Sequence, residues 1–207
     1  MRKLTLLVIS IATVFASCKK DKSDDPASTN NDVTINSTAQ VSFKLDGTTK
    51  SYVQSATIEQ SIGSSKSIAT WPDTSSGSWS CGFDDPNSGD DIFDISKGYL
   101  RFLGANPDTT VFYNFFVPGN SSYVNNPDIQ MGVELYYFIG GVKWSTELGS
   151  GLQTGSSFKI TDRKKVWLPT GDRGITVLIN FNCILYDGNG NSKTVTDGVF
   201  LGTYMDI

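Results

Sequence analysis

The sequence predicts an all-β protein, an antiparallel β-sandwich of about ten to twelve short strands. From Ala39 onward, apolar residues alternate with polar ones at a period of two, and turn residues recur about every eight to twelve positions. Apolar spacing of three and four residues, which would indicate helices, is absent outside the first 17 residues. A closed β-barrel is the alternative architecture, because its strands alternate in the same way.

The predicted sheet opens with a hairpin. Val41, Phe43 and Leu45 alternate with polar residues, and Asp46-Gly47 is a two-residue turn signal that leads into a strand over 48–59. The further strands predicted in the first part of the domain are 65–71, 78–83, 99–103, 110–117, 131–139 and 143–148. Of these, 110–117 contains four aromatic residues and ends at Pro118-Gly119, so we expect a strand that is buried on both faces.

The clearest strand is 174–186, where six apolar residues occupy one face over the whole length. Two short strands at 157–161 and 166–168 are predicted to flank a basic turn at 163–165. The last two predicted strands are 193–196 and 199–204. The domain is therefore expected to end on strands.

The first 17 residues have the layout of a cleaved secretory signal. Arg2 and Lys3 form a positively charged start, residues 4–16 are apolar, and small residues precede Cys18. The apolar stretch is shorter than the about 20 residues that a membrane-spanning helix needs. The segment resembles the signal of bacterial lipoproteins, in which the cysteine is acylated and becomes the new N-terminus. This resemblance implies lipidation at Cys18; the alternative is an ordinary signal peptide with an incidental cysteine.

Residues 19–38 are polar and charged and predict a flexible tether. The charged run at 19–25 looks like the tether of Bacteroidota lipoproteins, in which a lysine followed by acidic residues directs export to the cell surface. We therefore expect a signal peptide at 1–17, a lipidated tether at 18–38 and a single β-domain at 39–207. The expected location is the outer membrane, with the lipid-anchored domain at the cell surface or, alternatively, facing the periplasm.

The two ends of the domain carry a second resemblance. The segments 41–47 (VSFKLDG) and 194–200 (TVTDGVF) look like the ends of small Bacteroidota lipoprotein domains of unknown function. This resemblance implies a β-sandwich and supplies no activity.

Composition excludes several classes of function. Acidic residues outnumber basic ones by 21 to 17, which disfavours nucleic acid as a partner. The chain contains no histidine, which removes histidine-based catalysis and most zinc sites, and it has no phosphate-binding loop or dinucleotide motif. A carboxylate-based glycan hydrolase needs only two acids, and Glu59, Glu134 and Glu147 are the glutamates of the chain.

An acidic stretch at 84–94 is the most concentrated polar feature. It holds five carboxylates and an amide that could supply oxygen ligands to Ca²⁺, although the spacing does not match an EF-hand loop. The alternative is an exposed loop in which these side chains form local turns. The candidate cation-binding residues are Asp84, Asp85, Asn87, Asp90, Asp91 and Asp94.

Aromatic and cysteine residues supply the remaining candidates. Trp71 and Trp144 lie beside predicted turns, where they could stack on sugar rings; the alternative is that they pack in the core. Cys81 and Cys183 could form a disulfide in an oxidising compartment or remain two small buried thiols.

Together these features predict a non-enzymatic, lipid-anchored envelope protein that recognises an extracellular glycan or a protein. The alternatives are a structural or assembly component of an envelope complex and, third, the carboxylate-based hydrolase. We expect no resident cofactor apart from the candidate Ca²⁺, and no nucleotide.

Overall fold

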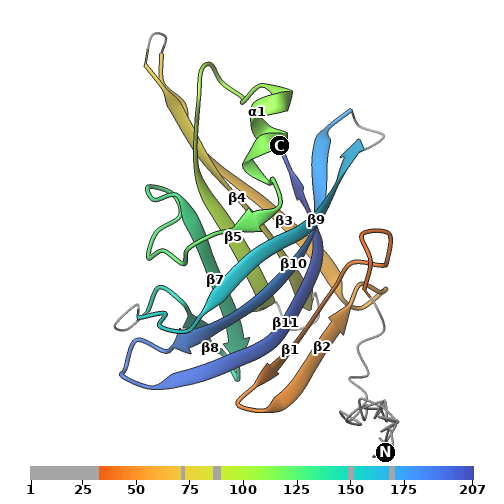
Figure 1. Cartoon of the computed structure of the whole chain (residues 1–207), viewed down its shortest axis with the longest axis vertical. Helices are drawn as coiled ribbons and strands as arrows, with labels where there is room; N and C mark the ends of the chain where they lie inside the picture. The colour runs from red at the N-terminus through yellow and green to blue at the C-terminus, as the bar shows by residue number, and fades with distance from the viewer. Residues whose placement is uncertain (1–32, 71–72, 86–89, 149–151, 168–170) are drawn as a thin grey trace, which may run out of the picture. The chain divides into compact units, whose positions relative to one another are not determined.

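The computed structural model describes residues 33–70, 73–85, 90–148, 152–167 and 171–207. They form an 11-stranded antiparallel sheet and one short helix, α1 (Figure 1). The all-β class is therefore confirmed. The elements are β1 (Gln40–Leu45), β2 (Thr48–Val53), β3 (Glu59–Ser67), β4 (Ser75–Asp85), β5 (Asp90–Phe102), α1 (Thr109–Phe115), β6 (Gly119–Asn120), β7 (Gly132–Ile139), β8 (Val142–Ser145), β9 (Ser157–Trp167), β10 (Arg173–Tyr186) and β11 (Ser192–Met205).

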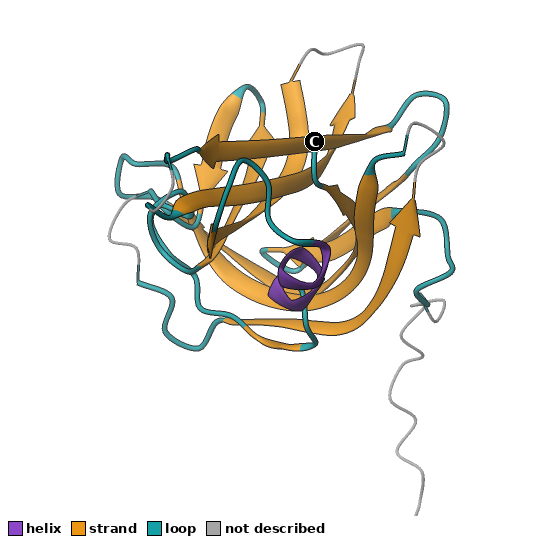
Figure 2. Cartoon of the chain, turned by 90° about the horizontal axis from the view of Figure 1, so that it is seen from above, coloured by secondary structure: helices purple, strands orange, loops and turns teal. Residues whose placement is uncertain are grey.

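The strands join in the order β2-β1-β11-β10-β8-β7-β5-β4-β3. One edge of β10 pairs with β11, while the other edge is shared between β9, along Arg173 to Asn182, and β8, at Tyr186. The strands wrap around an interior, and α1 lies inside their outline when the domain is seen from above (Figure 2). The predicted antiparallel strands thus form a single curled sheet, a half-barrel, which lies between the predicted sandwich and the barrel alternative.

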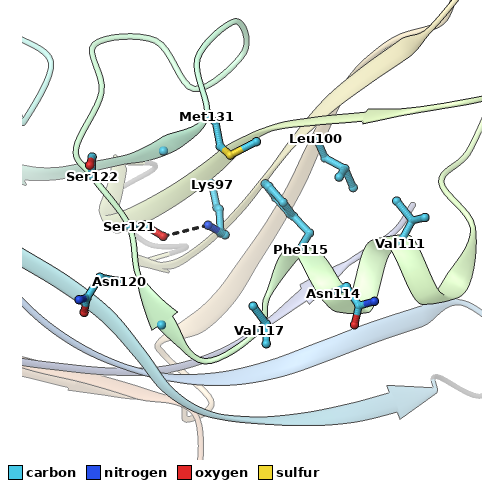
Figure 3. A pocket seen from close by; sticks show the side chains of 12 residues that line it. Lys97, Leu100, Val111, Asn114, Phe115, Val117, Asn120, Ser121, Ser122 and Met131 are labelled. Carbon is cyan, nitrogen blue, oxygen red and sulfur yellow. Dashed lines mark hydrogen bonds between the residues drawn. The ribbon is translucent and has the colours of Figure 1, made fainter.

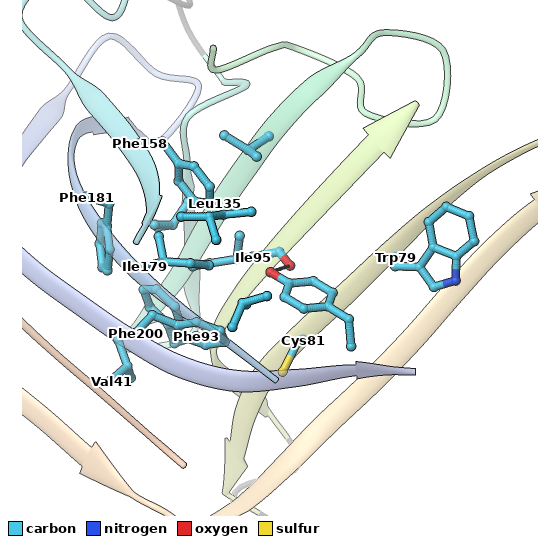
Figure 4. Packing of buried hydrophobic residues seen from close by; sticks show 14 of the residues in the cluster. Val41, Trp79, Cys81, Phe93, Ile95, Leu135, Phe158, Ile179, Phe181 and Phe200 are labelled. Atoms are coloured by element: carbon cyan, nitrogen blue, oxygen red, sulfur yellow. Dashed lines mark hydrogen bonds between the residues drawn. The ribbon is translucent and has the colours of Figure 1, made fainter. Parts of the chain in front are cut away.

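The core lies on the concave face of this sheet. The alternating apolar residues of β10 are all buried there, as their period of two predicts. Phe181 of β10 contacts Phe93 of β5 with ring centroids 5.8 Å apart, and Phe93 contacts Phe200 of β11 at 5.9 Å (Figure 4). Aromatic rings from three separate strands therefore meet in the middle of the half-barrel.

The segment predicted as a buried strand at 110–117 is a helix, so that prediction was wrong. Asp108 caps α1 by accepting a hydrogen bond from the Thr110 backbone N–H at 2.7 Å. Phe112 and Phe116, four positions apart, both face the core. Seven residues are too few to reveal a helical period, and the aromatic density indicated only burial.

Two predicted turns lie inside continuous strands. The basic residues at 163–165 are in the middle of β9, paired with β10. Asp197, which falls in the gap between the predicted strands 193–196 and 199–204, has a φ of 53° and lies within β11, next to an irregularity in its pairing with β10. A Cβ atom at the adjacent Gly198 would lie 2.6 Å from the Phe181 ring, so the close approach of the two strands requires glycine there.

Further strand boundaries differ from the predicted ones. β3 covers Glu59–Ser67 rather than 65–71, and β5 begins at Asp90, well before the predicted start at 99. Polar residues dominate β3, so hydropathy alone gave little sign of that strand.

Of the two alternatives for the cysteines, the disulfide is not formed. Cys81 and Cys183 are both buried and free. Cys81 Sγ accepts a hydrogen bond from Gln60 Nε2 at 3.1 Å, and burial raises the pKa of both thiols. The alternative, two small buried thiols, is the arrangement found.

Ion pairs of Asp206, directly after β11, stabilise the curl of the sheet. Asp206 accepts a hydrogen bond from Arg173 Nε at 2.8 Å and forms an ion pair with Lys66 of β3, also at 2.8 Å. Arg173 additionally donates to Thr109 Oγ1 at 2.6 Å, at the start of α1. The Asp206 cluster, defined as Asp206, Arg173 and Lys66, thereby connects the last strand to β3, β10 and the helix.

We expect Asp206→Asn to lower the free energy of unfolding by about 3–5 kcal/mol, because it leaves two partly buried cations without their anion. Asp197→Asn is the matched control, since Asp197 pairs with Lys44 at the exposed surface and its loss should cost less than about 1 kcal/mol. Urea unfolding measures both effects. Equal losses in the two variants would show that the Asp206 cluster does not hold the curl.

Candidate functional site

A pocket of about 650 Å³ lies between β5, α1 and the connection from α1 to β7 (Figure 3). Its size falls in the usual range of small-molecule sites. Its exposed lining surface is mainly apolar, although half of the lining side chains are polar, and Lys97 is the one titratable side chain among the described residues that line it. The lining residues are Lys97, Leu100, Val111, Asn114, Phe115, Val117, Gly119, Asn120, Ser121, Ser122, Met131 and Gly132.

Lys97 stands where the strand period places a core residue. Phe93 and Ile95 of β5 are fully buried on the concave face, and Lys97 follows in the same row. It is only 7 % exposed. The sequence carries a signal for it, the alternation of Phe93, Ile95 and Lys97 with polar residues, but placing the strand start at 99 left Lys97 outside the strand.

The Lys97 ammonium has few polar neighbours. Its Nζ donates to Ser121 Oγ at 3.0 Å and lies 4.7 Å from the centre of the Phe115 ring. In the sheet, Lys97 pairs with Trp79 of β4 and Val133 of β7. Burial lowers the pKa of Lys97 to about 8.

Ser121 lies on the connection from α1 to β7, which is hydrogen-bonded to both β9 and β7. Its backbone N–H donates to Phe158 O of β9 at 3.0 Å, directly after the β6 pairing. The N–H of Val133 in β7 donates to Ser122 O at 2.9 Å, so the two neighbouring serines are held by different strands. This connection also packs onto Gly98, where an added Cβ atom would overlap Pro127 O.

The helix forms the opposite wall. Phe112 and Phe116 anchor α1 in the core, while Val111, Asn114 and Phe115 line the pocket. Arg163 of β9 donates to the carbonyl oxygen of Tyr113, which fixes the helix against the sheet.

Apolar side chains border the mouth of the pocket. Met131 is 75 % exposed and Val117 is 53 % exposed, and both line the pocket. Ile129, two residues before Met131, is also exposed. Because exposed apolar side chains gather around a concave site, the mouth has the character of a ligand entrance.

The acidic stretch is split between two strands rather than forming one loop. Asp84 and Asp85 end β4, whereas Asp90, Asp91 and Asp94 lie in β5. Asp94 is buried and its Oδ1 accepts a hydrogen bond from Ser96 Oγ at 3.2 Å. Asn87 and the side chains of Asp85, Asp90 and Asp91 lie outside the described residues. Among the described residues, no three His, Cys, Asp or Glu side chains are grouped as a metal site.

The candidate stacking residues stay untested as a pair, because only Trp144 belongs to the described residues. Trp71 lies outside the described residues. Trp144 is half-buried against the core, and Lys193 Nζ lies 4.8 Å from the centre of its ring. Trp79 is fully buried against Phe112. Trp79 is therefore a core residue, and a sugar-stacking role for Trp71 and Trp144 stays a prediction.

Two of the glutamates do come together. Lys143 Nζ lies 3.3 Å from Glu134 Oε1 and 3.0 Å from Glu147 Oε1. Burial raises the pKa of Glu134, and the charge of Lys143 counteracts this rise. The ammonium occupies the gap between the carboxylates in which a hydrolase would place its substrate or water, so this geometry is that of an ion-pair cluster.

Cys18 lies outside the described residues, so lipidation stays a prediction. In the part of the chain that the structure describes, no helix combines the length and apolar character required of a membrane span.

Comparisons of the chain with protein families, with curated proteins and with solved structures find no match.

The lowered pKa of Lys97 predicts a pH dependence of stability. Between about 8 and 10.5, the unfolded chain keeps a proton on this lysine that the folded chain has lost. The free energy of unfolding should therefore rise with pH in this interval, by at most about 1.4 kcal/mol per pH unit.

The difference in the free energy of unfolding between the wild type and Lys97→Met isolates the contribution of Lys97, because all other groups titrate equally in both proteins. Urea unfolding at pH 7 to 9.5 should show the variant more stable than the wild type at pH 7, and the gap should narrow as the pH rises. A constant gap would contradict the assignment of a buried, charged lysine.

Proposed function

We propose that this protein is a lipid-anchored envelope protein whose β-domain is a non-enzymatic binding module for a small apolar ligand. The observation that carries the proposal is the pocket beneath α1, with its exposed apolar mouth and largely apolar lining. The anchor is Cys18, and the expected location is the outer membrane, with the domain at the cell surface.

The chemistry of the lining favours binding over catalysis. General acid–base catalysis requires a titratable group beside a reacting atom, usually with a second group that positions or complements it. Among the described lining residues the hydrogen-bond partner of Lys97 is Ser121 Oγ. With a pKa of about 8 the lysine is mostly protonated at pH 7, so it donates to this hydroxyl and does not take its proton. Apolar side chains with a few polar groups are typical of sites that hold a ligand unchanged.

The construction of the pocket also suits a binding module. Its first wall is β5, which has a partner strand on both edges. The second is helix α1, which Asp108 caps and aromatic residues anchor in the core, and the third is a connection that is hydrogen-bonded to β7 and β9. A site preformed on such elements avoids the entropic cost of being ordered by its ligand.

Filling the pocket tests the binding proposal. Val117→Trp places an indole at the mouth, so we expect at least tenfold weaker binding of a neutral, apolar fluorescent probe such as N-phenyl-1-naphthylamine. Val142→Trp is the matched control, because Val142 is similarly exposed (46 %) but lies beyond the far end of β7. Fluorescence titration measures both affinities. Equal probe binding in the two variants would refute this pocket as the site.

A separate variant tests the anchor. Cys18→Ala should release the protein from the membrane fraction, because acyl chains that each contribute about 0.8 kcal/mol per buried methylene are lost. Ser17→Ala, which keeps a small residue before the cysteine, should remain in the membrane fraction. Fractionation and immunoblotting follow the protein. Retention of the Cys18→Ala protein in the membrane would contradict the lipoprotein interpretation.

A further inference from the structure

We propose that the ligand of this pocket is an amphiphile with a single carboxylate, whose head group pairs with the Lys97 ammonium and the Ser121 hydroxyl. Its apolar part would lie against Phe115, Val117 and Met131, which line the way to the mouth. This inference rests on the proposed binding function and deepens it by assigning the chemistry of the ligand.

The argument begins with the charge balance of the pocket. An ammonium group has three N–H donors, and the described contacts of Lys97 are one hydroxyl and one aromatic face. Neither carries a negative charge. A buried cation without an anion is costly, and a ligand carboxylate within hydrogen-bond distance would supply the missing charge. Figure 3 shows the Lys97 ammonium directed toward Ser121 at the inner end of the pocket.

The charge of the site selects a monoanion. Lys97 is the one cation among the described lining residues. A phosphate monoester carries about −1.5 to −2 charges at pH 7 and would bring an excess of negative charge into an apolar site. A carboxylate carries one charge and can accept from both the ammonium and the adjacent hydroxyl.

The lining selects an apolar body for the ligand. Leu100, Val111 and Phe115 form a continuous apolar wall from β5 to α1. Each methylene buried there contributes about 0.8 kcal/mol, or roughly a fourfold gain in affinity. Because the apolar surface continues to exposed Met131, the tail has a path from the inner end to solvent.

The protonation of Lys97 should control binding. The groups that face it from other elements are Trp79 on β4, Val133 on β7, Phe115 on α1 and Ser121 on the connection, and none of them titrates between pH 6 and 10. The connection also carries the carboxylate of Asp128, which accepts a hydrogen bond from Ser78. The affinity for a carboxylate should therefore fall once the pH exceeds the pKa of Lys97 in the unliganded protein.

Displacement of the neutral probe by dodecanoate, dodecanol and dodecyl phosphate tests the inference on the wild type, Lys97→Met and Lys97→Arg proteins. At pH 7 the wild type should bind dodecanoate about tenfold to a hundredfold more tightly than dodecanol, as expected for a charge-assisted hydrogen bond. Lys97→Met should lose this preference and still bind dodecanol. Lys97→Arg should keep the preference up to pH 10, where the wild type has lost most of it, because a guanidinium stays charged.

The outcomes separate the two proposals. If dodecanol displaces the probe and dodecanoate binds no more tightly, the carboxylate inference fails and the apolar binding site stands. Tighter binding of dodecyl phosphate than of dodecanoate would also overturn it. If the probe itself does not bind to the wild type, the proposed function fails together with the inference.

Discussion

The ion pairs of Asp206 hold the curvature on which the rest of the structure depends. A sheet of eleven strands has one face to bury, and without a second sheet it can do so only by curling on itself. Curling brings the end of β11 to β3, the opposite edge in the strand order, where Asp206 meets Lys66. The same carboxylate holds Arg173, and Arg173 holds the start of α1. One buried anion therefore fixes both the curl and the helix over its interior.

The pocket exists because the curled sheet divides along β10. Since β9 takes part of one edge of β10 and β8 takes another part, β9 and β7 are not paired with each other at this end. The connection through Ser121 and Ser122 spans the two strands, and Tyr123 forms a bridge with Val133. The helix and this connection cover the end of the core without filling all the space beside Lys97, and that space is the pocket.

The sequence predicted the fold class because long strands repeat their pattern. In β10 the six inward positions are all apolar, so a period of two is unmistakable, and the Asp46-Gly47 hairpin follows from local turn chemistry alone. Helix α1 was missed because three of its seven residues are aromatic and its one visible start signal is Asp108, directly before it. Its helical state depends on tertiary packing over the curled sheet, which no local pattern encodes.

The candidate site was harder to predict than the fold. The two hydrogen-bonded polar residues of the site, Lys97 and Ser121, are 24 positions apart. They meet because β5 pairs with β7, while β6, directly before Ser121, pairs with β9. The acidic stretch and the tryptophans stand out in the sequence because the acids are concentrated and the tryptophans are large, whereas the pocket depends on a single lysine without such a signal. The sequence signal of Lys97 is its position, because it is a charged residue in the row of β5 in which Phe93 and Ile95 are buried.

Lys97 differs from two other buried charged groups described in this chain, because they have partners of opposite charge. Asp206 has two cations beside it, and buried Glu134 has Lys143 at 3.3 Å. Lys97 is as buried as these groups, yet its described contacts contain no anion. A methionine would fill the same row of β5 at lower cost, so the lysine lowers stability in the unliganded state. Local rules are typically broken in this way at functional sites, where the compensating interaction comes from outside the chain.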